Sequence, residues 1–291
     1  MVEFLVGVDG GGTGTRAILA RPDGTVLARG EAGPSALGQG IAAAWAQVHA
    51  AIAAAFVAAD LPQPAWSRIA IAAGLSGVHT TGLADAFRTE LPSFGKVLLE
   101  TDGYTMLIGA HAGQPGVMVA AGTGSVGEVL RSDLSHAVAG GWGFPVGDEG
   151  SGTWLGLQAV RIAQAAMDGR APVGALARQV WGLCGHDRQA LAGWCAGAAQ
   201  FAYSQVAPKV FECEHSDPVA AELLQQAARD LESIAEALDP KCSLPVAICG
   251  SIGLRLQRRM TQELRDRCVQ ASMGPAEGAL WLLQQSLRER S

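Results

Sequence analysis

The sequence predicts an α/β protein built from two duplicated domains. A short stretch, Gly12-Thr13-Gly14-Thr15, recurs as Gly122-Thr123-Gly124-Ser125, 110 residues later. Each copy follows an apolar run with the composition of a buried strand. A chain of 291 residues is long enough for two domains of ordinary size. Chance similarity between glycine-rich stretches, in a chain with 38 glycines, is the alternative explanation of the repeat.

The composition favours a globular cytoplasmic protein. Hydrophobic residues make up 49% of the chain, charged residues 16%, and the net charge is −6 without a run of lysine or arginine. We therefore expect no nucleic-acid partner. The uncharged stretch 41–59 is mostly alanine, which gains little from lipid, so it predicts a packed helix rather than a membrane span. The N-terminus lacks the features of a signal peptide, and the six dispersed cysteines are expected to be reduced thiols.

The first half of the chain predicts three strands followed by alternating helices and strands. We expect strands at 3–8, 15–21 and 26–30, with a turn at 22–24 between the last two. Further along, the pattern predicts a helix at 39–59, a strand at 68–73, a helix at 81–90, a strand at 96–100 and a helix at 104–112.

The second half repeats this order. Strands are expected at 116–121, 127–131, 136–139 and 244–249, and helices at 152–167, 218–238, 254–270 and from Pro275 onward. The glycine- and proline-containing segment 113–116 predicts a hinge. The expected domains are 1–112 together with 275–291, and 113–274.

The segment Asp9-Gly10-Gly11-Gly12-Thr13-Gly14-Thr15 predicts a phosphate-binding hairpin. It lacks the lysine of a Walker loop, and its glycine spacing differs from that of a dinucleotide fingerprint. Because a strand follows, the phosphate would be held by a nest of backbone N–H groups instead of a helix N-terminus. Asp9 would bind Mg²⁺ beside that phosphate, directly or through water. A plain glycine hairpin is the alternative.

Three motifs together resemble a known superfamily. Asp9–Thr15, Ala121–Ser125 and Cys249–Gly253 are similar to the phosphate-1, phosphate-2 and adenosine motifs of the sugar kinase/Hsp70/actin superfamily. The motif Gly141-Trp142-Gly143, with the later Gly147-Asp148-Glu149-Gly150-Ser151-Gly152, resembles the N-acetylglucosamine kinase branch of the BadF/BadG group. The resemblance implies two ribonuclease H-like (actin-like ATPase) domains with a cleft between them.

The resemblance also implies roles for particular residues. ATP phosphates would be held by Gly11, Gly12, Thr13, Thr15, Gly122, Thr123 and Gly124, and the adenosine by Gly250 and Ser251. The sugar would be bound by Ser76, Asp102 and Asp148, with Asp102 also serving as the catalytic base.

Asp102 is a candidate base on chemical grounds as well. It follows a predicted strand, where α/β proteins collect ligands, and one carboxylate suffices to accept the proton of an attacking hydroxyl. The alternative is that Asp102 caps the next helix. Asp148 and Glu149 have the same alternative, an acidic cap on helix 152–167, and the role of Glu149 stays open.

This sequence differs from the related family at one position that would bind the sugar. The related family often has an asparagine after the third strand, whereas this chain has Gly33-Pro34-Ser35-Ala36-Leu37. The resemblance makes N-acetylglucosamine the first choice of substrate, and the missing amide leaves free glucosamine as the second choice.

We expect an ATP-dependent kinase that phosphorylates an amino sugar on its 6-hydroxyl with Mg²⁺. No membrane partner is expected, and a homodimer is left open. Two other functions share the phosphate motifs: an ATPase activator of a radical dehydratase, and a nucleotide-switched binding protein. The first would hold an iron–sulfur cluster through clustered cysteines, but none of the cysteines here precedes Cys184.

Overall fold

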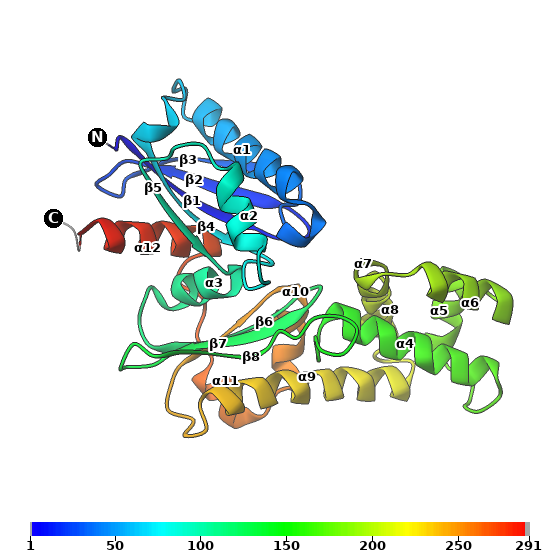
Figure 1. Ribbon diagram of the computed structural model, residues 1–291. Helices are drawn as coiled ribbons and strands as arrows, with labels where there is room; N and C mark the ends of the chain where they lie inside the picture. Colours follow the sequence, from blue (N-terminus) through cyan, green and yellow to red (C-terminus); the bar gives the residue numbers. More distant parts are fainter. Residues whose placement is uncertain (1, 289–291) are drawn as a thin grey trace. The chain divides into compact units, whose positions relative to one another are not determined.

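Two sheets of matching topology form the framework of the molecule (Figure 1). The computed structural model describes residues 2–288. In the first sheet the strand order is β3-β2-β1-β4-β5, and in the second it is β8-β7-β6-β9. Each begins with a three-strand antiparallel meander and continues with strands parallel to the first one. The strands are β1 Phe4–Gly10, β2 Thr15–Ala20, β3 Val26–Ala32, β4 Ile69–Leu75, β5 Lys96–Glu100, β6 Gly116–Ala121, β7 Ser125–Leu130, β8 His136–Gly140 and β9 Val246–Cys249.

The chain divides into two compact units, one around each sheet. Unit 1 comprises the residues up to Pro115 together with those from Gln270 onward, and unit 2 comprises Gly116–Val269. The chain therefore leaves unit 1 once and returns to it for the C-terminal helix. This α/β organisation is the fold class that the repeat predicts.

Unit 1 packs helices on both faces of its sheet. Helix α1 (Ile41–Ala58) covers one face and buries Val48, Ile52 and Phe56. Its hydropathy of 1.7 and its length would also suit a membrane span, but its buried face belongs to the sheet core, as expected for a packed helix. Helix α12 (Pro275–Arg288) covers the opposite face. Gly7 permits this contact, because a Cβ there would lie 2.2 Å from the carbonyl oxygen of Ala276.

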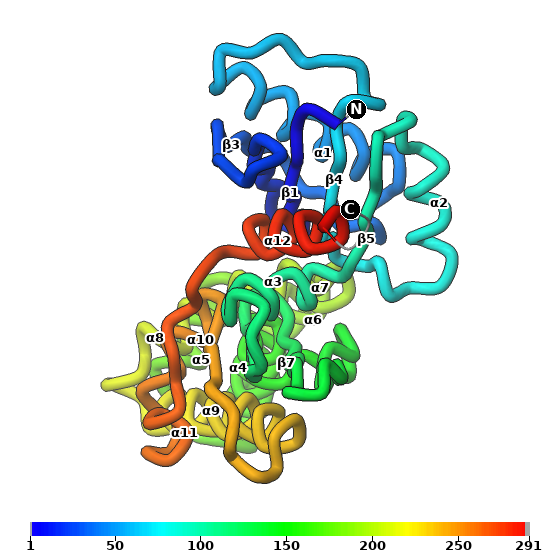
Figure 2. Tube along the Cα trace, turned by 90° about the vertical axis from the view of Figure 1, so that its left-hand side faces the viewer, coloured from blue at the N-terminus to red at the C-terminus, as the bar shows by residue number. Residues whose placement is uncertain are grey.

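Helix α3 (Asp102–His111) lies beside α12, as Figure 2 shows. The two backbones meet at Gly278, where a Cβ would lie 2.0 Å from the carbonyl oxygen of Thr105. This packing fixes the start of α3, and with it Asp102, on the framework of unit 1. Helix α2 (Leu83–Glu90) and the short turns η1 (Leu37–Gln39) and η2 (Trp66–Arg68) complete the unit.

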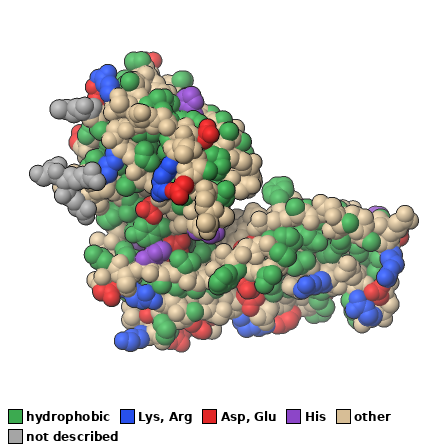
Figure 3. Space-filling model, viewed as in Figure 1, with side chains coloured by type: hydrophobic (Ala, Val, Ile, Leu, Met, Phe, Trp, Pro, Cys, Tyr) green, Lys and Arg blue, Asp and Glu red, His purple; other side chains and the backbone are tan. Residues whose placement is uncertain are grey.

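Unit 2 has the larger helical part. Its core is formed by β6, β7 and β9 with α4 and α9 and the helices between them. These are α4 Gly152–Met167, α5 Ala175–Cys184, α6 Arg188–Gly197, α7 Gln200–Ser204, α8 Ala207–Glu212 and α9 Pro218–Leu238. After β9 come α10 Ser251–Leu256, η3 Gln257–Arg259 and α11 Gln262–Arg267. On the face drawn in Figure 3, acidic and basic side chains are interspersed.

The structure corrects several predicted boundaries. The helix expected at 39–59 begins at Ile41, because Gly40 has a φ of +122° and separates it from η1. The helix expected at 254–270 is three short pieces: α10 continues as the 3-10 turn η3, and the extended backbone of Met260 separates η3 from α11. Strand β7 begins at Ser125, two residues before the predicted start.

Candidate active site

The first glycine-rich hairpin presents backbone donors at its tip. Gly10 pairs with Thr15 at the last ladder position, and Gly11–Gly14 form the turn. The N–H of Gly11 closes this turn by donating to the carbonyl oxygen of Gly14 at 3.1 Å. Within residues 2–288, the N–H groups of the next three residues, 12–14, have no hydrogen-bond partner, and Thr13 is exposed. This is the arrangement that a phosphate nest requires.

The second hairpin repeats this arrangement with a turn that is one residue shorter. Ala121 pairs with Ser125, and the N–H of Gly122 donates to the carbonyl oxygen of Gly124 at 2.9 Å. The Thr123 carbonyl oxygen accepts the N–H and the hydroxyl of Thr153, at 3.1 and 2.6 Å. The first turn of α4 therefore fixes this hairpin. The N–H groups of Thr123 and Gly124 remain unbonded within the described part of the chain.

Thr15, which is also predicted to bind phosphate, has a buried side chain at the base of the first hairpin. Thr15 is 1% exposed, and its hydroxyl lies 2.6 Å from the carbonyl oxygen of Gly33 and 2.7 Å from Oγ of Ser35. Its repeat partner Ser125 is also buried and donates to the carbonyl oxygen of Glu149 at 2.7 Å. Both hydroxyls are directed inward because they anchor the loops behind the hairpins.

Asp9 lies at the C-terminal end of β1, beside the first hairpin. Its carboxylate is 17% exposed, and Arg16 on the neighbouring strand lies 3.7 Å away. The pKa of Asp9 is raised to about 6, mainly by burial and also by the charges of Asp102 and Glu277, against the lowering effect of Arg16. Asp9 is therefore a poorly solvated carboxylate in a negative environment, which a bound cation would relieve.

Asp102 is the first residue of α3, at the same edge of the sheet as Asp9. Strands β1, β4 and β5 run parallel, so the residues that follow them meet at one edge. The capping interpretation of Asp102 is wrong: Thr101 is the N-cap and accepts the N–H of Tyr104 at 3.0 Å. Burial raises the pKa of Asp102, although the Gly103 N–H, the Ser76 hydroxyl and His79 oppose the shift.

The donor set at this edge fits a magnesium ion. Mg²⁺ is usually held by one or two carboxylates together with waters and substrate phosphates. Asp9 and Asp102 supply two carboxylates whose charges repel one another, beside a hairpin with unbonded N–H groups. Asp9 is the nearer of the two to the hairpin in the chain.

Asp148 is placed beside the second hairpin. Its Oδ1 accepts the Ser125 N–H at 3.2 Å, and its Oδ2 accepts the Gln200 amide at 2.9 Å. The residue is 4% exposed, and burial raises its pKa. Asp148 is not the cap of α4, because Ser151 accepts the N–H of Trp154 at 3.2 Å. The carboxylate links the hairpin to α7, and its role toward a sugar stays a prediction.

Gly250 and Ser251 follow β9 at the same edge of unit 2. Gly250 has a φ of +79°, and a Cβ there would lie 2.3 Å from the carbonyl oxygen of Ala121, the last residue before the hairpin turn. Glycine is therefore required both for the backbone angle and for the close approach. Ser251 is exposed at the first position of α10. The structure thus brings the predicted adenosine motif next to the predicted phosphate motif.

Ser76 and the segment 33–37 surround the first hairpin. The N–H of Ser76 donates to the carbonyl oxygen of Gly10 at 2.9 Å, and its side chain hydrogen-bonds to Asp102. Ser35 is fully buried and donates its N–H to the carbonyl oxygen of Gly11 at 3.0 Å. Ser35 therefore supports the hairpin from behind, where it is closed to a ligand.

Sequence reasoning missed two residues of this site. Gln200 lies in a helical region without a motif, so only the fold reveals its bond to Asp148. Ser35 lies in segment 33–37, which has no asparagine where the related family often has one. The adjacent Pro34 indicates a loop. No pattern in the sequence indicates that the Ser35 hydroxyl is buried opposite Thr15.

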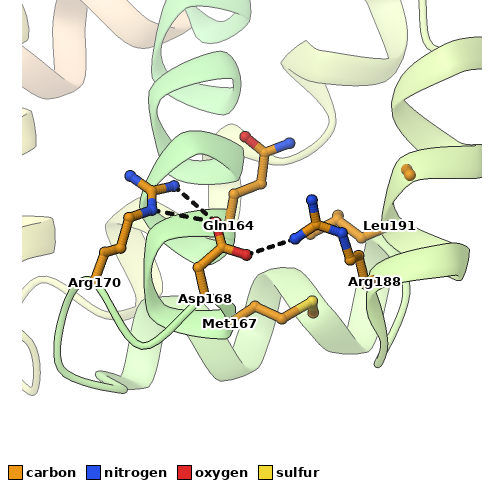
Figure 4. A pocket seen from close by; sticks show the side chains of 7 residues that line it. Gln164, Met167, Asp168, Arg170, Arg188 and Leu191 are labelled. Atoms are coloured by element: carbon orange, nitrogen blue, oxygen red, sulfur yellow. Dashed lines mark hydrogen bonds and ion pairs between the residues drawn. The ribbon is translucent and has the colours of Figure 1, made fainter.

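A pocket of about 270 Å³ lies elsewhere in unit 2, at the C-terminal end of α4 (Figure 4). Asp168 forms ion pairs there with Arg170 at 3.0 Å and Arg188 at 2.8 Å. Asp168 thus pairs with both arginines of the pocket. This pocket is therefore a weaker candidate than the hairpin edges.

The paired sheets and hairpins define the class as an actin-like ATPase fold. The same fold occurs in the activator of the 2-hydroxyisocaproyl-CoA dehydratase from Clostridium difficile, at 12% identity and a TM-score of 0.54, over 99% of this chain and 96% of that one. The chain belongs to the BadF/BadG/BcrA/BcrD ATPase family, whose model matches residues 6–281.

Two relatives are more similar. Glucosamine kinase GspK from Vibrio cholerae is 31% identical over 280 residues, which cover 96% of this chain and 95% of that protein. A Chromobacterium violaceum structure, named provisionally as an N-acetylglucosamine kinase, is 48% identical with a TM-score of 0.94, over 97% of this chain and 99% of that one.

Proposed function

We propose that this protein is an ATP-dependent kinase that transfers the γ-phosphoryl group of ATP to the 6-hydroxyl of an amino sugar in the cytoplasm. The observation that carries the proposal is the pair of equivalent hairpins, whose tip N–H groups have no partner among the described residues, together with a carboxylate of raised pKa at the edge of unit 1. The names of the two similar proteins support the amino sugar as acceptor.

Unit 1 supplies the groups that act on the acceptor hydroxyl. Asp102 accepts the hydroxyl proton as the sugar oxygen attacks the γ-phosphorus, and ADP leaves with the electrons of the broken P–O bond. A raised pKa suits this role, because a base works best when its pKa lies near the working pH. Ser76 orients the carboxylate through its hydrogen bond.

The hairpins hold the phosphates. In unit 1 the N–H groups of Gly12 and Thr13 would donate to phosphate oxygens, and in unit 2 those of Thr123 and Gly124 would do the same, with the threonine hydroxyls as further donors. Asp9 would hold Mg²⁺, which neutralises phosphate charge when bound. Gly250 and Ser251 lie against the adenosine. Asp148 keeps the second hairpin in place and contributes to the sugar site.

Free glucosamine is the acceptor that this chain favours. The similar Vibrio cholerae protein is named for that sugar, and the segment after β3 lacks an amide side chain that could bind an N-acetyl group. In addition, Asp9 lies in a negative environment made by Asp102 and Glu277, which suits a cationic ammonium group. N-acetylglucosamine is the second choice.

A coupled assay of ADP release tests the proposal. The purified protein would be given ATP and Mg²⁺ with glucose, glucosamine, N-acetylglucosamine or N-acetylmannosamine. We expect sustained release only with an amino sugar and only with Mg²⁺. Rapid hydrolysis without any sugar, together with no response to the panel, would instead favour an activator or a switch.

A further inference from the structure

Arg255 lies over an aromatic ring at the surface of unit 2. It is in α10, and its Cζ is 3.7 Å from the centroid of the Phe211 ring, which belongs to α8. Phe211 is 6% exposed, so the ring is fixed in the core, whereas Arg255 is exposed. One face of the guanidinium therefore contacts the ring and its other face is open.

The other arginines in this part of the chain are held by polar partners. Arg258 and Arg259 both pair with Glu214, at 2.7 and 2.9 Å. Arg265 donates to the carbonyl oxygen of Arg258 at 2.7 Å, and Arg267 pairs with Asp239 at 2.5 Å. Arg255 has no hydrogen bond or ion pair with any residue between 2 and 288. A planar cation held only by stacking keeps its open face and its donors for a ligand.

Arg255 is one helical turn from the predicted adenosine motif. Gly250 contacts Ala121 at the base of the second hairpin, and α10 starts at the next residue. Ser251 and Arg255 are four residues apart, so they share a face of α10 with a rise of about 6 Å between them. Ile252 and Ser204 both lie near Gly152 at the start of α4. The base of the second hairpin and Arg255 are thus joined by the first turn of α10 within unit 2.

From this geometry we propose that Arg255, supported by Phe211, is the platform on which the adenine base of ATP stacks. The triphosphate lies at the hairpin, the ribose passes Ser251, and the base rests on the open face of the guanidinium. The inference rests on the proposed function, because it requires that the chain uses ATP. Stacking of a base on a planar side chain tolerates different bases, so Arg255 contributes affinity for a purine more than a choice between purines.

Calorimetry on the full chain tests the platform with two probes, ADP and inorganic tripolyphosphate. Arg255→Ala should weaken ADP binding about 5- to 150-fold, the range expected for one stacked base, and leave tripolyphosphate binding unchanged. Arg255→Lys should behave like the alanine variant, because lysine keeps the charge but has no planar group. Arg258→Ala, which removes an exposed arginine of the same segment, is the matched control and should bind both probes normally.

A second variant separates stacking from other effects. Phe211→Leu keeps an apolar core residue and removes the ring beneath Arg255. It should weaken ADP binding, and the double variant should be no weaker than Arg255→Ala alone, because both changes remove one interaction. Equal losses for ADP and tripolyphosphate, or full rescue by Arg255→Lys, would show that Arg255 acts by charge and would overturn the platform.

The outcome also separates this inference from the proposed function. If the protein phosphorylates an amino sugar and Arg255→Ala binds ADP normally, the platform is wrong and the kinase stands. If ADP binding depends on Arg255 but no sugar is phosphorylated, the platform stands and the proposed function is wrong.

Discussion

Asp102 and its neighbour Thr101 divide two tasks that the sequence alone could not separate. Both could cap α3, but the side chain of Thr101 does so, which leaves the carboxylate of Asp102 for chemistry. Burial raises the pKa of that carboxylate, while Ser76 and the Gly103 N–H keep it oriented. Mutation of Thr101 tests the helix cap, and mutation of the adjacent Asp102 tests the proposed base.

Asp102→Asn should lower kcat by about 10²–10⁴-fold, the usual contribution of a general base, and leave sugar affinity almost unchanged. Asparagine keeps the shape and a hydrogen bond but cannot accept the proton. Thr101→Ala is the control: it should reduce the free energy of unfolding by about 1 kcal/mol through loss of the cap, and retain turnover. Steady-state kinetics and urea unfolding give both results. An Asp102→Asn variant within a few-fold of the wild type would rule out the base.

Asp9→Asn should stabilise the protein at pH 8 while weakening its response to Mg²⁺. The pKa of Asp9 rises from 3.8 to about 6 on folding, so the folded state binds the proton more tightly than the unfolded state. The free energy of unfolding therefore decreases as the pH rises from about 4 to about 6. Asparagine avoids this decrease because its side chain does not ionise. The difference corresponds to at most about 3 kcal/mol at 1.36 kcal/mol per pKa unit. Unfolding at pH 8 and at pH 4 measures it. An equal effect at both pH values would contradict the assignment.

At the scale of the elements, the two hairpins are the repeated structure that we propose binds phosphate. Thr13 and Thr123 occupy equivalent places at the tips, whereas Thr15 and Ser125 are buried at the bases. The repeat thus separates a residue exposed to a ligand from a residue that anchors the loop. In both copies the first glycine N–H closes the turn, so the donors left for phosphate come from the residues after it.

Thr13→Val and Thr123→Val should each raise the KM for ATP or lower kcat while leaving stability unchanged. Thr15→Val, by contrast, should lower the free energy of unfolding by about 1–3 kcal/mol, because it leaves buried polar partners unsatisfied. Kinetics and thermal unfolding of the three variants make the comparison. If one tip variant is inactive and the other has wild-type kinetics, the hairpins do not act as equivalent halves of a clamp.

Asp148→Ala and Gln200→Ala distinguish a sugar ligand from a structural link. Both variants break the bond between the second hairpin and α7, but only the first removes the carboxylate. We expect Asp148→Ala to weaken sugar binding strongly and Gln200→Ala to weaken it little, as measured by calorimetry with sugar alone. Equal, small effects on sugar affinity would return Asp148 to a purely structural role.

At the scale of the whole molecule, the sequence predicted the elements whose signals are local. Strands β1 and β6 are continuous apolar runs, and α9 matches its predicted bounds because Pro218 and Leu238 delimit an amphipathic segment. The helices α5 to α8 were not predicted, because they are short and their region contains many glycine and alanine residues. The sheets confirm the α/β fold class, and the similar structures confirm its actin-like type.

The site was predictable where a motif marks it and unpredictable where it depends on tertiary contacts. The hairpins, Asp9 and Asp102 follow strands and can be identified from glycine spacing and strand ends. The Gln200 bond to Asp148 and the stack of Arg255 on Phe211 join helices that are far apart in the chain. No local signal specifies such pairs, because each partner alone resembles an ordinary helical residue.

The most direct test of the central claim follows phosphorus in one reaction. The protein would be incubated with ATP, Mg²⁺ and glucosamine, and the products recorded by ³¹P nuclear magnetic resonance. The account predicts that a phosphomonoester on the 6-hydroxyl of the sugar forms in equal amount to ADP. Inorganic phosphate as the product released with ADP, without a sugar phosphate, would contradict it.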